Sequence, residues 1–225
     1  MIHSKSVDTF LFDLDGTLTD PRLGITESVR YAMGKMKRPL SPQTNIDWCI
    51  GPPLQENFAR LLDTTDQARI DEAVAFFRER FSTVGLYENE LYPDIPPVLT
   101  QLQAGGCRMF VATSKPTVFA AKIVAHFKLD AYFEMVHGCE LNGHNSHKPD
   151  LIRYILQQEQ LDPTKTVMIG DREHDIIGAK ANGLYAAGVT YGYGKEQDLV
   201  NAGADQILRT PTDILQLMNF PIGTK

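Results

Sequence analysis

The sequence predicts a doubly wound α/β fold that is interrupted near its N-terminal end by a helical insertion. From residue 92 onward, short β-branched and aromatic runs alternate with segments of helical periodicity. Residues 23–91 break this alternation, since they contain helical stretches and no convincing strand. Alternating strands and helices imply right-handed crossovers and a mostly parallel sheet that helices cover on both faces. The length of 225 residues suits one full domain and a smaller insertion.

The elements of the core follow in order along the chain. The first strand is expected at residues 7–12, an apolar run that stops at the turn signal Asp13-Leu14-Asp15-Gly16. Further strands are expected at residues 107–113, 132–137, 166–170, 185–190 and 206–208. Helices between them are expected at residues 95–104, 116–127, 150–160, 174–182 and 195–201, the first of which starts at a proline pair.

The insertion is expected to contain helices at residues 25–37, 53–62 and 67–82. It begins directly after the first strand, so it leaves the sheet at the carboxyl edge, where ligands of open α/β folds bind. We therefore expect residues 19–91 to form an all-helical cap domain over a binding site. Residues 1–18 and 92–225 are expected to form the core domain.

Composition and charge exclude several classes of protein. Hydrophobic residues make up 43% and charged residues 22%, which is typical of a globular protein and not of a disordered or fibrous one. The net charge of −6 argues against a partner that is a nucleic acid polymer or a membrane surface. No apolar run approaches about 18 residues, and no basic stretch leads into an apolar leader. We expect a cytoplasmic protein with a small or metal-mediated partner.

The three cysteines, Cys49, Cys107 and Cys139, are far apart and form no CxxC pair. Neither a disulfide framework nor a thiolate zinc site is indicated, and a reducing compartment fits this usage.

Asp13 and Asp15 follow the first expected strand. Residues two apart in an extended segment point the same way, so both carboxylates are able to project into one crevice. The alternative is that Asp15-Gly16 is only a turn.

Asp171 and Asp175 form a second acidic pair, at the end of the apolar run 166–170. Two strands of one parallel sheet would then present acids at the same edge. Crowded carboxylates repel one another unless a cation offsets their charge, so the cluster implies a divalent metal. An all-oxygen set suits Mg²⁺ best. The alternative for either residue alone is a helix N-cap.

Thr113, Ser114 and Lys148 are candidates for binding an anion. Thr113 and Ser114 end an apolar strand ahead of a helix that starts at Pro116, and hydroxyls at a helix N-terminus favour anion binding. Lys148 stands just before another expected helix, where it would supply a fixed positive charge beside a phosphate. The alternatives are helix caps for the hydroxyls and a solvated surface position for the lysine.

Two other features of the sequence give weaker indications of function. The segment Tyr191-Gly192-Tyr193-Gly194 lacks the spacing of a dinucleotide-binding motif and is interpreted as a flexible loop. Trp48 and Phe58 in the insertion have rings that could stack on a nucleobase, but packing in the core is the favoured interpretation.

The four pieces together resemble the haloacid dehalogenase superfamily of phosphohydrolases: the segment 13–17, then Thr113, then Lys148, then Gly170-Asp171 with Asp175. The resemblance runs from the first strand to about residue 210. The insertion, including residues 50–54, resembles the C1-type cap of the phosphoglycolate phosphatase-like branch. Residues 111–116, 168–179 and 191–194 resemble a bacterial subgroup described as 5′-nucleotidase-like. The resemblance implies a Rossmann-like core.

The resemblance also implies roles for individual residues. Asp13 would attack phosphorus and form an aspartyl-phosphate. Asp15 would protonate the leaving alkoxide and later accept a proton from water, and an acid at this position points to phosphate esters. Thr113 and Lys148 would hold the transferring phosphoryl group.

Mg²⁺ is the cofactor that the resemblance implies. Its ligands would be the Asp13 carboxylate, the Asp15 backbone carbonyl and Asp171, with Asp175 binding directly or through water.

The sequence is therefore interpreted as a Mg²⁺-dependent phosphomonoesterase, monomeric or homodimeric, that acts on a small phosphorylated metabolite. The resemblance suggests a nucleoside 5′-monophosphate or 2-phosphoglycolate as substrate. One alternative is a phosphomutase of the same superfamily. Another is a non-enzymatic phosphorylated signalling module similar to receiver domains, which is disfavoured because the expected nucleophile ends the first strand here and because of the cap.

Overall fold

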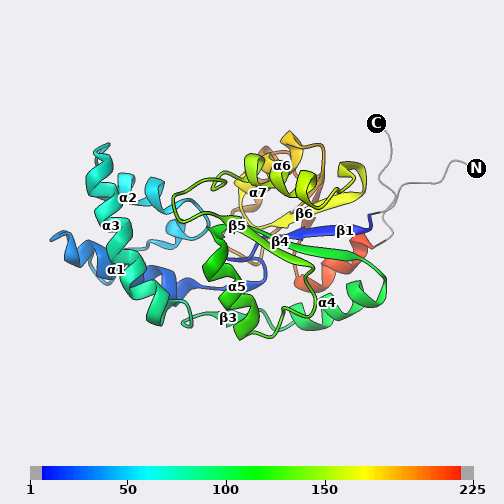
Figure 1. Ribbon diagram of the computed structural model, residues 1–225, viewed down its shortest axis with the longest axis horizontal. Coiled ribbons are helices and arrows are strands. Elements are labelled where there is room, and N and C mark those ends of the chain that lie inside the picture. The colour runs from blue at the N-terminus through cyan, green and yellow to red at the C-terminus, as the bar shows by residue number, and fades with distance from the viewer. Residues whose placement is uncertain (1–6, 219–225) are drawn as a thin grey trace, which may run out of the picture.

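A six-stranded parallel sheet with helices on both faces forms the larger part of the computed structural model, which describes residues 7–218 (Figure 1). The strand order is β5-β4-β1-β6-β7-β8, and every neighbouring pair in this sheet is parallel. The strands are β1 (Thr9–Phe12), β4 (Arg108–Pro116), β5 (Met135–Cys139), β6 (Thr166–Gly170), β7 (Tyr185–Val189) and β8 (Gln206–Leu208). The predicted doubly wound, Rossmann-like core is confirmed.

Both faces of the sheet are buried, which explains why its strands are continuously apolar in sequence. Phe10 and Phe12 of β1 belong to an apolar cluster that includes residues of α4 (Ile95–Ala104) and α5 (Thr117–His126). Leu11, which alternates with them, belongs to a second cluster on the other face. That cluster is completed by residues of the helices α6 (Lys148–Gln158), α7 (Glu173–Ala181) and α8 (Glu196–Asn201).

The centre of the sheet is a topological switch point between β1 and β6. From β1 the chain proceeds outward through β4 and β5, then returns to place β6 on the other side of β1. Phe12 of β1 is in register with Ile169 of β6, and the Asp13 backbone N–H donates to the Ile169 carbonyl at 2.9 Å. The carboxyl ends of these two strands therefore lie side by side, in the position where open α/β sheets bind ligands.

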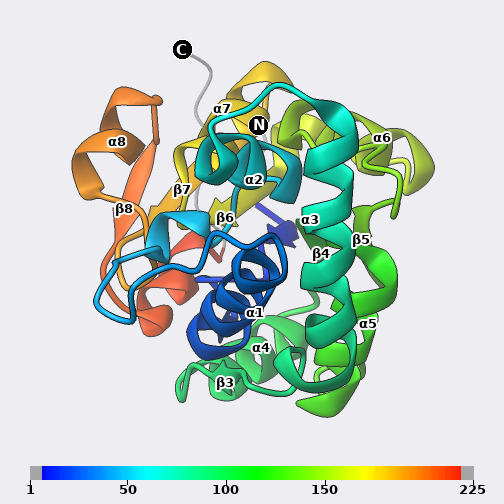
Figure 2. The ribbon, with the colours of Figure 1, turned by 90° about the vertical axis from the view of Figure 1, so that its left-hand side faces the viewer.

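The insertion lies in front of this carboxyl edge, as the view from its side shows (Figure 2). Its helices are α1 (Arg22–Lys35), α2 (Leu54–Leu62) and α3 (Gln67–Arg80), with a 3₁₀ turn at Asp47–Cys49 and a π-helical turn at Phe81–Gly85. Helix α3 packs against both α1 and α2. Buried residues of all three helices belong to the same apolar cluster as Phe10 and Phe12, so the insertion is packed onto the core.

The expectation that residues 19–91 are entirely helical misses one small feature. The ends of the insertion form an antiparallel pair of two-residue strands, β2 (Thr19–Asp20) and β3 (Glu90–Leu91). A two-residue strand carries no periodicity, and its partner lies some 70 residues away, so only the folded chain brings the two together. The expected boundaries also shift at α6, which begins at Lys148, so this lysine lies in the first turn of a helix.

Two further expectations, about the cysteines and about membrane-spanning helices, can be compared with the structure. Cys49, Cys107 and Cys139 are all free thiols. Among residues 7–218, no helix has the length and apolar character that crossing a membrane requires.

Helix α1 meets the π-helical turn with almost no space between the two backbones. A methyl group at Gly24 would lie 1.9 Å from the Gly85 carbonyl oxygen. A methyl group at Gly34, on the same helix, would meet nothing within 4 Å. The two glycines of α1 are thus under opposite constraints.

We expect Gly24→Ala to lower the free energy of unfolding by roughly 1–3 kcal/mol, because the added methyl group forces the two backbones apart. Gly34→Ala should raise it by up to about 1 kcal/mol, because alanine favours the helix and meets no obstacle. Urea denaturation measures both changes. Similar effects of the two substitutions would show that the contact with Gly85 does not limit packing here.

Candidate active site

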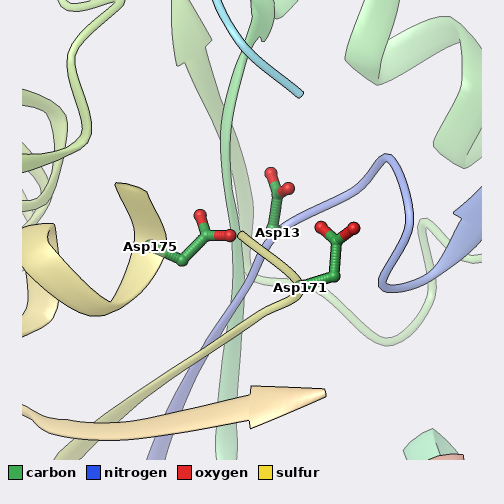
Figure 3. A group of neighbouring side chains, drawn as sticks. All are labelled: Asp13, Asp171 and Asp175. Carbon is green, nitrogen blue, oxygen red and sulfur yellow. The ribbon is translucent and has the colours of Figure 1, made fainter. Parts of the chain in front are cut away.

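Three carboxylates from separate parts of the core converge at the switch point. Asp13 follows β1, Asp171 follows β6, and Asp175 lies in the first turn of α7. One oxygen from each lies within 4.8 Å of the others, and Figure 3 shows the three side chains around a common space. All three residues are buried, with 4%, 0% and 1% of their surface exposed. The sequence analysis predicted that these acids share one sheet edge, and the structure brings them together.

The electrostatics of this cluster favour a bound cation. Burial raises the pKa of Asp171 well above its usual range, and the neighbouring charges of Asp13 and Asp175 raise it further. Burial likewise raises the pKa of Asp175 to about 6, against the lowering effect of Lys148. Asp171 Oδ1 has no hydrogen-bond partner among the described residues. A buried set of oxygen ligands with an unpartnered atom fits a hard divalent cation such as Mg²⁺.

Lys148 supplies one positive charge to the cluster. Its ammonium lies 2.8 Å from Asp13 Oδ1 and 2.5 Å from Asp175 Oδ1, and it donates to the Ala112 carbonyl at 2.7 Å. Burial lowers the pKa of Lys148, but the two carboxylates more than offset this effect, so the pKa is raised. Two of its N–H groups donate hydrogen bonds, to Asp13 Oδ1 and to the Ala112 carbonyl, and Asp175 is an ion-pair partner. Lys148 therefore fixes the position of the Asp13 carboxylate as well as neutralising part of the negative charge.

The Asp15 carboxylate is not one of the three converging groups. It turns instead toward Lys115, whose ammonium lies 2.8 Å from Asp15 Oδ2 and 4.8 Å from the centre of the Phe81 ring. Burial raises the pKa of Asp15, while Lys115 acts in the opposite direction. A raised pKa favours a carboxyl group that is able to donate a proton.

The partnership of Lys115 with Asp15 was missed by the sequence analysis, although Lys115 lies in the recognised segment 111–116. The contact depends on the parallel register that pairs Phe12 with Val111, which only the folded sheet establishes, so the sequence held no signal for it.

A cavity of about 60 Å³ lies between the core and the insertion. Asp13, Asp15, Thr113 and Ser114 are among the polar residues that line it. Its apolar walls include Ile25, Cys49, Leu54, Phe77 and Phe81 from the insertion and Phe119 from the core. The volume admits a few water molecules, which is comparable to a phosphoryl group and too small for a nucleoside. The insertion therefore covers the site closely in this structure.

The predicted phosphate-binding residues all border this region. Thr113 is 2% exposed, and its Oγ1 accepts a hydrogen bond from the Lys115 backbone N–H at 3.2 Å. Ser114 lines both the cavity and a neighbouring pocket of about 290 Å³, which Lys148 also lines. This second pocket is also bordered by Glu56 and His147.

The segment 191–194, interpreted from sequence as a flexible loop, packs against the acidic cluster. The Tyr193 backbone N–H donates to Asp171 Oδ2 at 2.7 Å, and the Tyr191 hydroxyl donates to the Thr17 carbonyl at 3.0 Å. A methyl group at Gly192 would lie 2.3 Å from the Gly16 carbonyl oxygen and 2.5 Å from Asp171 Cβ. Glycine is needed here because the loop approaches Asp171 so closely, which is the physical reason that the expectation of a free loop was wrong.

The two aromatic residues considered for base stacking have other roles. Phe58 is fully buried and in ring contact with Phe77, so the core interpretation is confirmed for it. Trp48 is half-buried, and the Arg60 guanidinium lies 4.0 Å from its ring centre.

The chain is similar to known proteins along most of its length. Residues 10–189 match the family model described as haloacid dehalogenase-like hydrolase. The chain is 47% identical over 189 residues to a 5′-nucleotidase from Pseudomonas aeruginosa, covering 84% of this chain and 85% of the relative. It is 35% identical over 211 residues to the tyrosine-protein kinase PtkA from Mycobacterium tuberculosis, covering 94% of this chain and 69% of that protein.

More distant similarity extends to a phosphoglycolate phosphatase from Colwellia psychrerythraea, with 27% identity over 92% of this chain and 95% of the relative. Among solved structures, that of a predicted phosphatase from Clostridium acetobutylicum superposes with a TM-score of 0.90 at 40% identity, over 94% of this chain and 99% of the other.

The raised pKa values of Asp15, Asp171 and Asp175 predict how the stability of the metal-free protein depends on pH. Each group holds its proton more tightly in the folded state, so folding is favoured at low pH and loses stability as pH rises from about 4 through 6 and beyond. Asparagine at position 171 does not ionise. In EDTA, we expect Asp171→Asn to reduce the loss of stability between pH 5 and pH 8 by on the order of a few kcal/mol.

Thermal melts at the two pH values measure this difference. Asp8→Asn is the matched control, because Asp8 is half-exposed and pairs with Lys165 away from the cluster. An equal loss of stability in the Asp171→Asn and wild-type proteins would contradict the inference that ionisation of the crowded carboxylates destabilises the folded protein as pH rises.

Proposed function

This chain belongs to the haloacid dehalogenase-like hydrolase family and is a phosphatase, and we propose that it is a Mg²⁺-dependent phosphomonoester hydrolase for a small phosphorylated metabolite. The observation that carries the proposal is the convergence of Asp13, Asp171 and Asp175 within 4.8 Å, with Lys148 bound to Asp13. The cluster lies beside a cavity that Asp13 and Asp15 line together. This arrangement supplies a nucleophile, a proton donor and a cation site in one place.

In the proposed reaction, Asp13 attacks phosphorus and forms an aspartyl-phosphate, while the bond from phosphorus to the ester oxygen breaks. Asp15 gives its proton to the departing alkoxide and then takes a proton from the attacking water. Hydrolysis of the aspartyl-phosphate releases inorganic phosphate and regenerates both carboxyl groups. The contact of Lys148 with Asp13 and the raised pKa of Asp15 support these two roles.

The remaining residues of the site would hold the cation and the phosphoryl group. Mg²⁺ would be bound by the Asp13 carboxylate, the Asp15 backbone carbonyl and Asp171, with Asp175 binding directly or through water. When bound, Mg²⁺ would stabilise the negative charge of the transferring phosphoryl group. Thr113, Ser114 and Lys148 would bind the phosphoryl oxygens. Their positions along the two adjoining pockets support this role.

We assign residues 19–91 as a cap domain and residues 1–18 with 92–225 as the core domain, of which residues 1–6 and 219–225 lie outside the described part of the chain. Support comes from the position of α1, α2 and α3 over the carboxyl edge of the sheet and from the pairing of β2 with β3 at the base of the insertion. Closure of such a cap would exclude bulk water from the reaction. We also propose a cytoplasmic location, in agreement with three free cysteines.

The first candidate substrate is a nucleoside 5′-monophosphate, supported by the relative named 5′-nucleotidase. The second is 2-phosphoglycolate, supported by the more distant phosphoglycolate phosphatase. The cavity beside Asp13 measures about 60 Å³ and is partly open to solvent, so a nucleoside would need more additional room there than a glycolate group.

Asp13→Asn should abolish phosphate release from p-nitrophenyl phosphate in the presence of Mg²⁺, with a loss on the order of a thousandfold or more, because the amide is not a nucleophile. Phosphate production measures the effect. Asp8→Asn, a half-exposed aspartate just before the same strand, should retain wild-type activity. Unchanged phosphate release by the Asp13→Asn protein would remove Asp13 from the proposed mechanism.

A panel of phosphorylated metabolites, assayed with Mg²⁺ and again with EDTA, tests cofactor and substrate together. We expect Mg²⁺-dependent release of inorganic phosphate, with nucleoside 5′-monophosphates ahead of 2-phosphoglycolate in kcat/KM. Isomerisation of a sugar phosphate without phosphate release would favour a phosphomutase. Transfer of labelled phosphate from ATP to tyrosine would favour the activity in the name of the mycobacterial relative.

A further inference from the structure

We propose that Arg172 is a positioning residue that couples closure of the insertion to the geometry of the acidic cluster. The inference rests on the proposed function, because it takes the cavity beside Asp13 as the place where substrate reacts. Arg172 stands directly after Asp171, and its side chain crosses from the core to the insertion.

On the side of the insertion, Arg172 holds two backbone carbonyls. Its Nε donates to the Ile50 carbonyl at 3.0 Å, and its Nη2 donates to the Ile50 and Asp47 carbonyls at 2.5 and 3.1 Å. These carbonyls flank the 3₁₀ turn that carries Cys49, and Cys49 lines the cavity. A guanidinium suits this task because it presents several donors in one rigid plane. Arg172 thereby holds one wall of the cavity in place.

On the side of the core, Arg172 hydrogen-bonds to Asp175 and to Tyr193, which in turn hydrogen-bonds to Asp171; both aspartates are candidate metal ligands. The Arg172 backbone N–H donates to Asp175 Oδ2 at 3.0 Å. Its Nη1 donates to the Tyr193 carbonyl at 3.3 Å, and the Tyr193 N–H in turn donates to Asp171 Oδ2 at 2.7 Å. Asp171 lies in the short connection after β6, and Asp175 lies in the first turn of α7, which follows it (Figure 3). The position of Arg172 is therefore tied to the position of both carboxylates.

Linkage makes this coupling work in both directions. If a cation and a phosphoryl group draw Asp171 and Asp175 into one arrangement, the side chain of Arg172 is fixed with them, and closure over the cavity is favoured. If closure is lost, the cluster loses part of its support. Among residues 7–218, Arg78 also joins the insertion to the core, through a hydrogen bond to the Leu141 carbonyl at 2.7 Å, and it donates to no residue of the cluster.

Arg22 provides a matched control for Arg172. Its Nε donates to Asp47 Oδ1 at 3.0 Å, so it contacts the same turn, but Arg22 itself belongs to the insertion. Loss of Arg22 removes a contact of Asp47 without removing a link between the insertion and the core.

Labelling of Cys49 reports the position of the turn directly. Cys49 is 2% exposed, and we measure its alkylation by peptide mass spectrometry, with the buried Cys139 of β5 as an internal reference. We expect Arg172→Gln to label Cys49 on the order of tenfold faster than wild type, with Cys139 unchanged, since several hydrogen bonds are lost. Arg172→Lys should lie between the two, and Arg22→Gln within twofold of wild type.

The coupling itself is tested with Mg²⁺ and orthovanadate, which mimics a transferring phosphoryl group. Together they should slow labelling of Cys49 in the wild-type and Arg22→Gln proteins. In Arg172→Gln, most of this protection of Cys49 should be lost. The value of kcat/KM for p-nitrophenyl phosphate should fall about tenfold in Arg172→Gln and be unchanged in Arg22→Gln.

Equal labelling of Cys49 in Arg172→Gln and wild type overturns the proposal, as does protection by Mg²⁺ and orthovanadate that survives the substitution. Faster labelling of Cys139 together with Cys49 indicates a general loss of structure and also counts against it. If Arg172→Gln does not fold, Arg172→Lys carries the same comparison. Absence of phosphatase activity in the wild-type protein would refute the proposed function alone, because labelling without ligands needs no turnover.

Discussion

The crowding of three buried carboxylates, two of which pair with one ammonium, is the constraint on which the rest of the structure depends. Asp13, Asp171 and Asp175 repel one another in a buried site, and Lys148 offsets only part of that charge. A less rigid framework would let the side chains move apart. Here β1 and β6 are adjacent and in register, so the sheet itself keeps Asp13 beside Asp171. Binding of a cation would recover the stability that this arrangement costs, and would link folding to metal affinity.

Residues 171–175, which run from the end of β6 into the first turn of α7, contact several parts of the site. Asp171 and Asp175 supply two of the carboxylates, and Asp171 accepts a hydrogen bond from the Tyr193 backbone. Arg172 donates hydrogen bonds to the insertion. The insertion in turn supplies most of the apolar wall of the cavity beside Asp13. A phosphoryl group bound there would be surrounded by a low-dielectric wall on one side and by fixed charges on the other, a combination in which electrostatic stabilisation is strong.

Much of the fold was predictable from local signals. The strand β6 and the helix α4 occupy the predicted residues, because a short apolar run bounded by turns and a helix that begins at prolines are specified by their own sequence. Asp13, Asp15, Thr113, Lys148 and Asp171 were recognisable as a set through the resemblance to the haloacid dehalogenase superfamily. The pairing of β2 with β3 was not predictable, since neither two-residue strand has a pattern of its own.

The sequence alone determined most strands and helices of the core, and which acids stand at the ends of β1 and β6. These properties depend on neighbours a few positions away, through side-chain alternation, helical periodicity and turn formation. Only the tertiary structure decided that Lys115 pairs with Asp15, that Tyr193 supports Asp171 and that Arg172 reaches Ile50. Each of these contacts joins residues distant in the chain, and its geometry depends on strand order, close backbone packing and the placement of the insertion. No local pattern encodes such distances, because they are set only when the whole core packs.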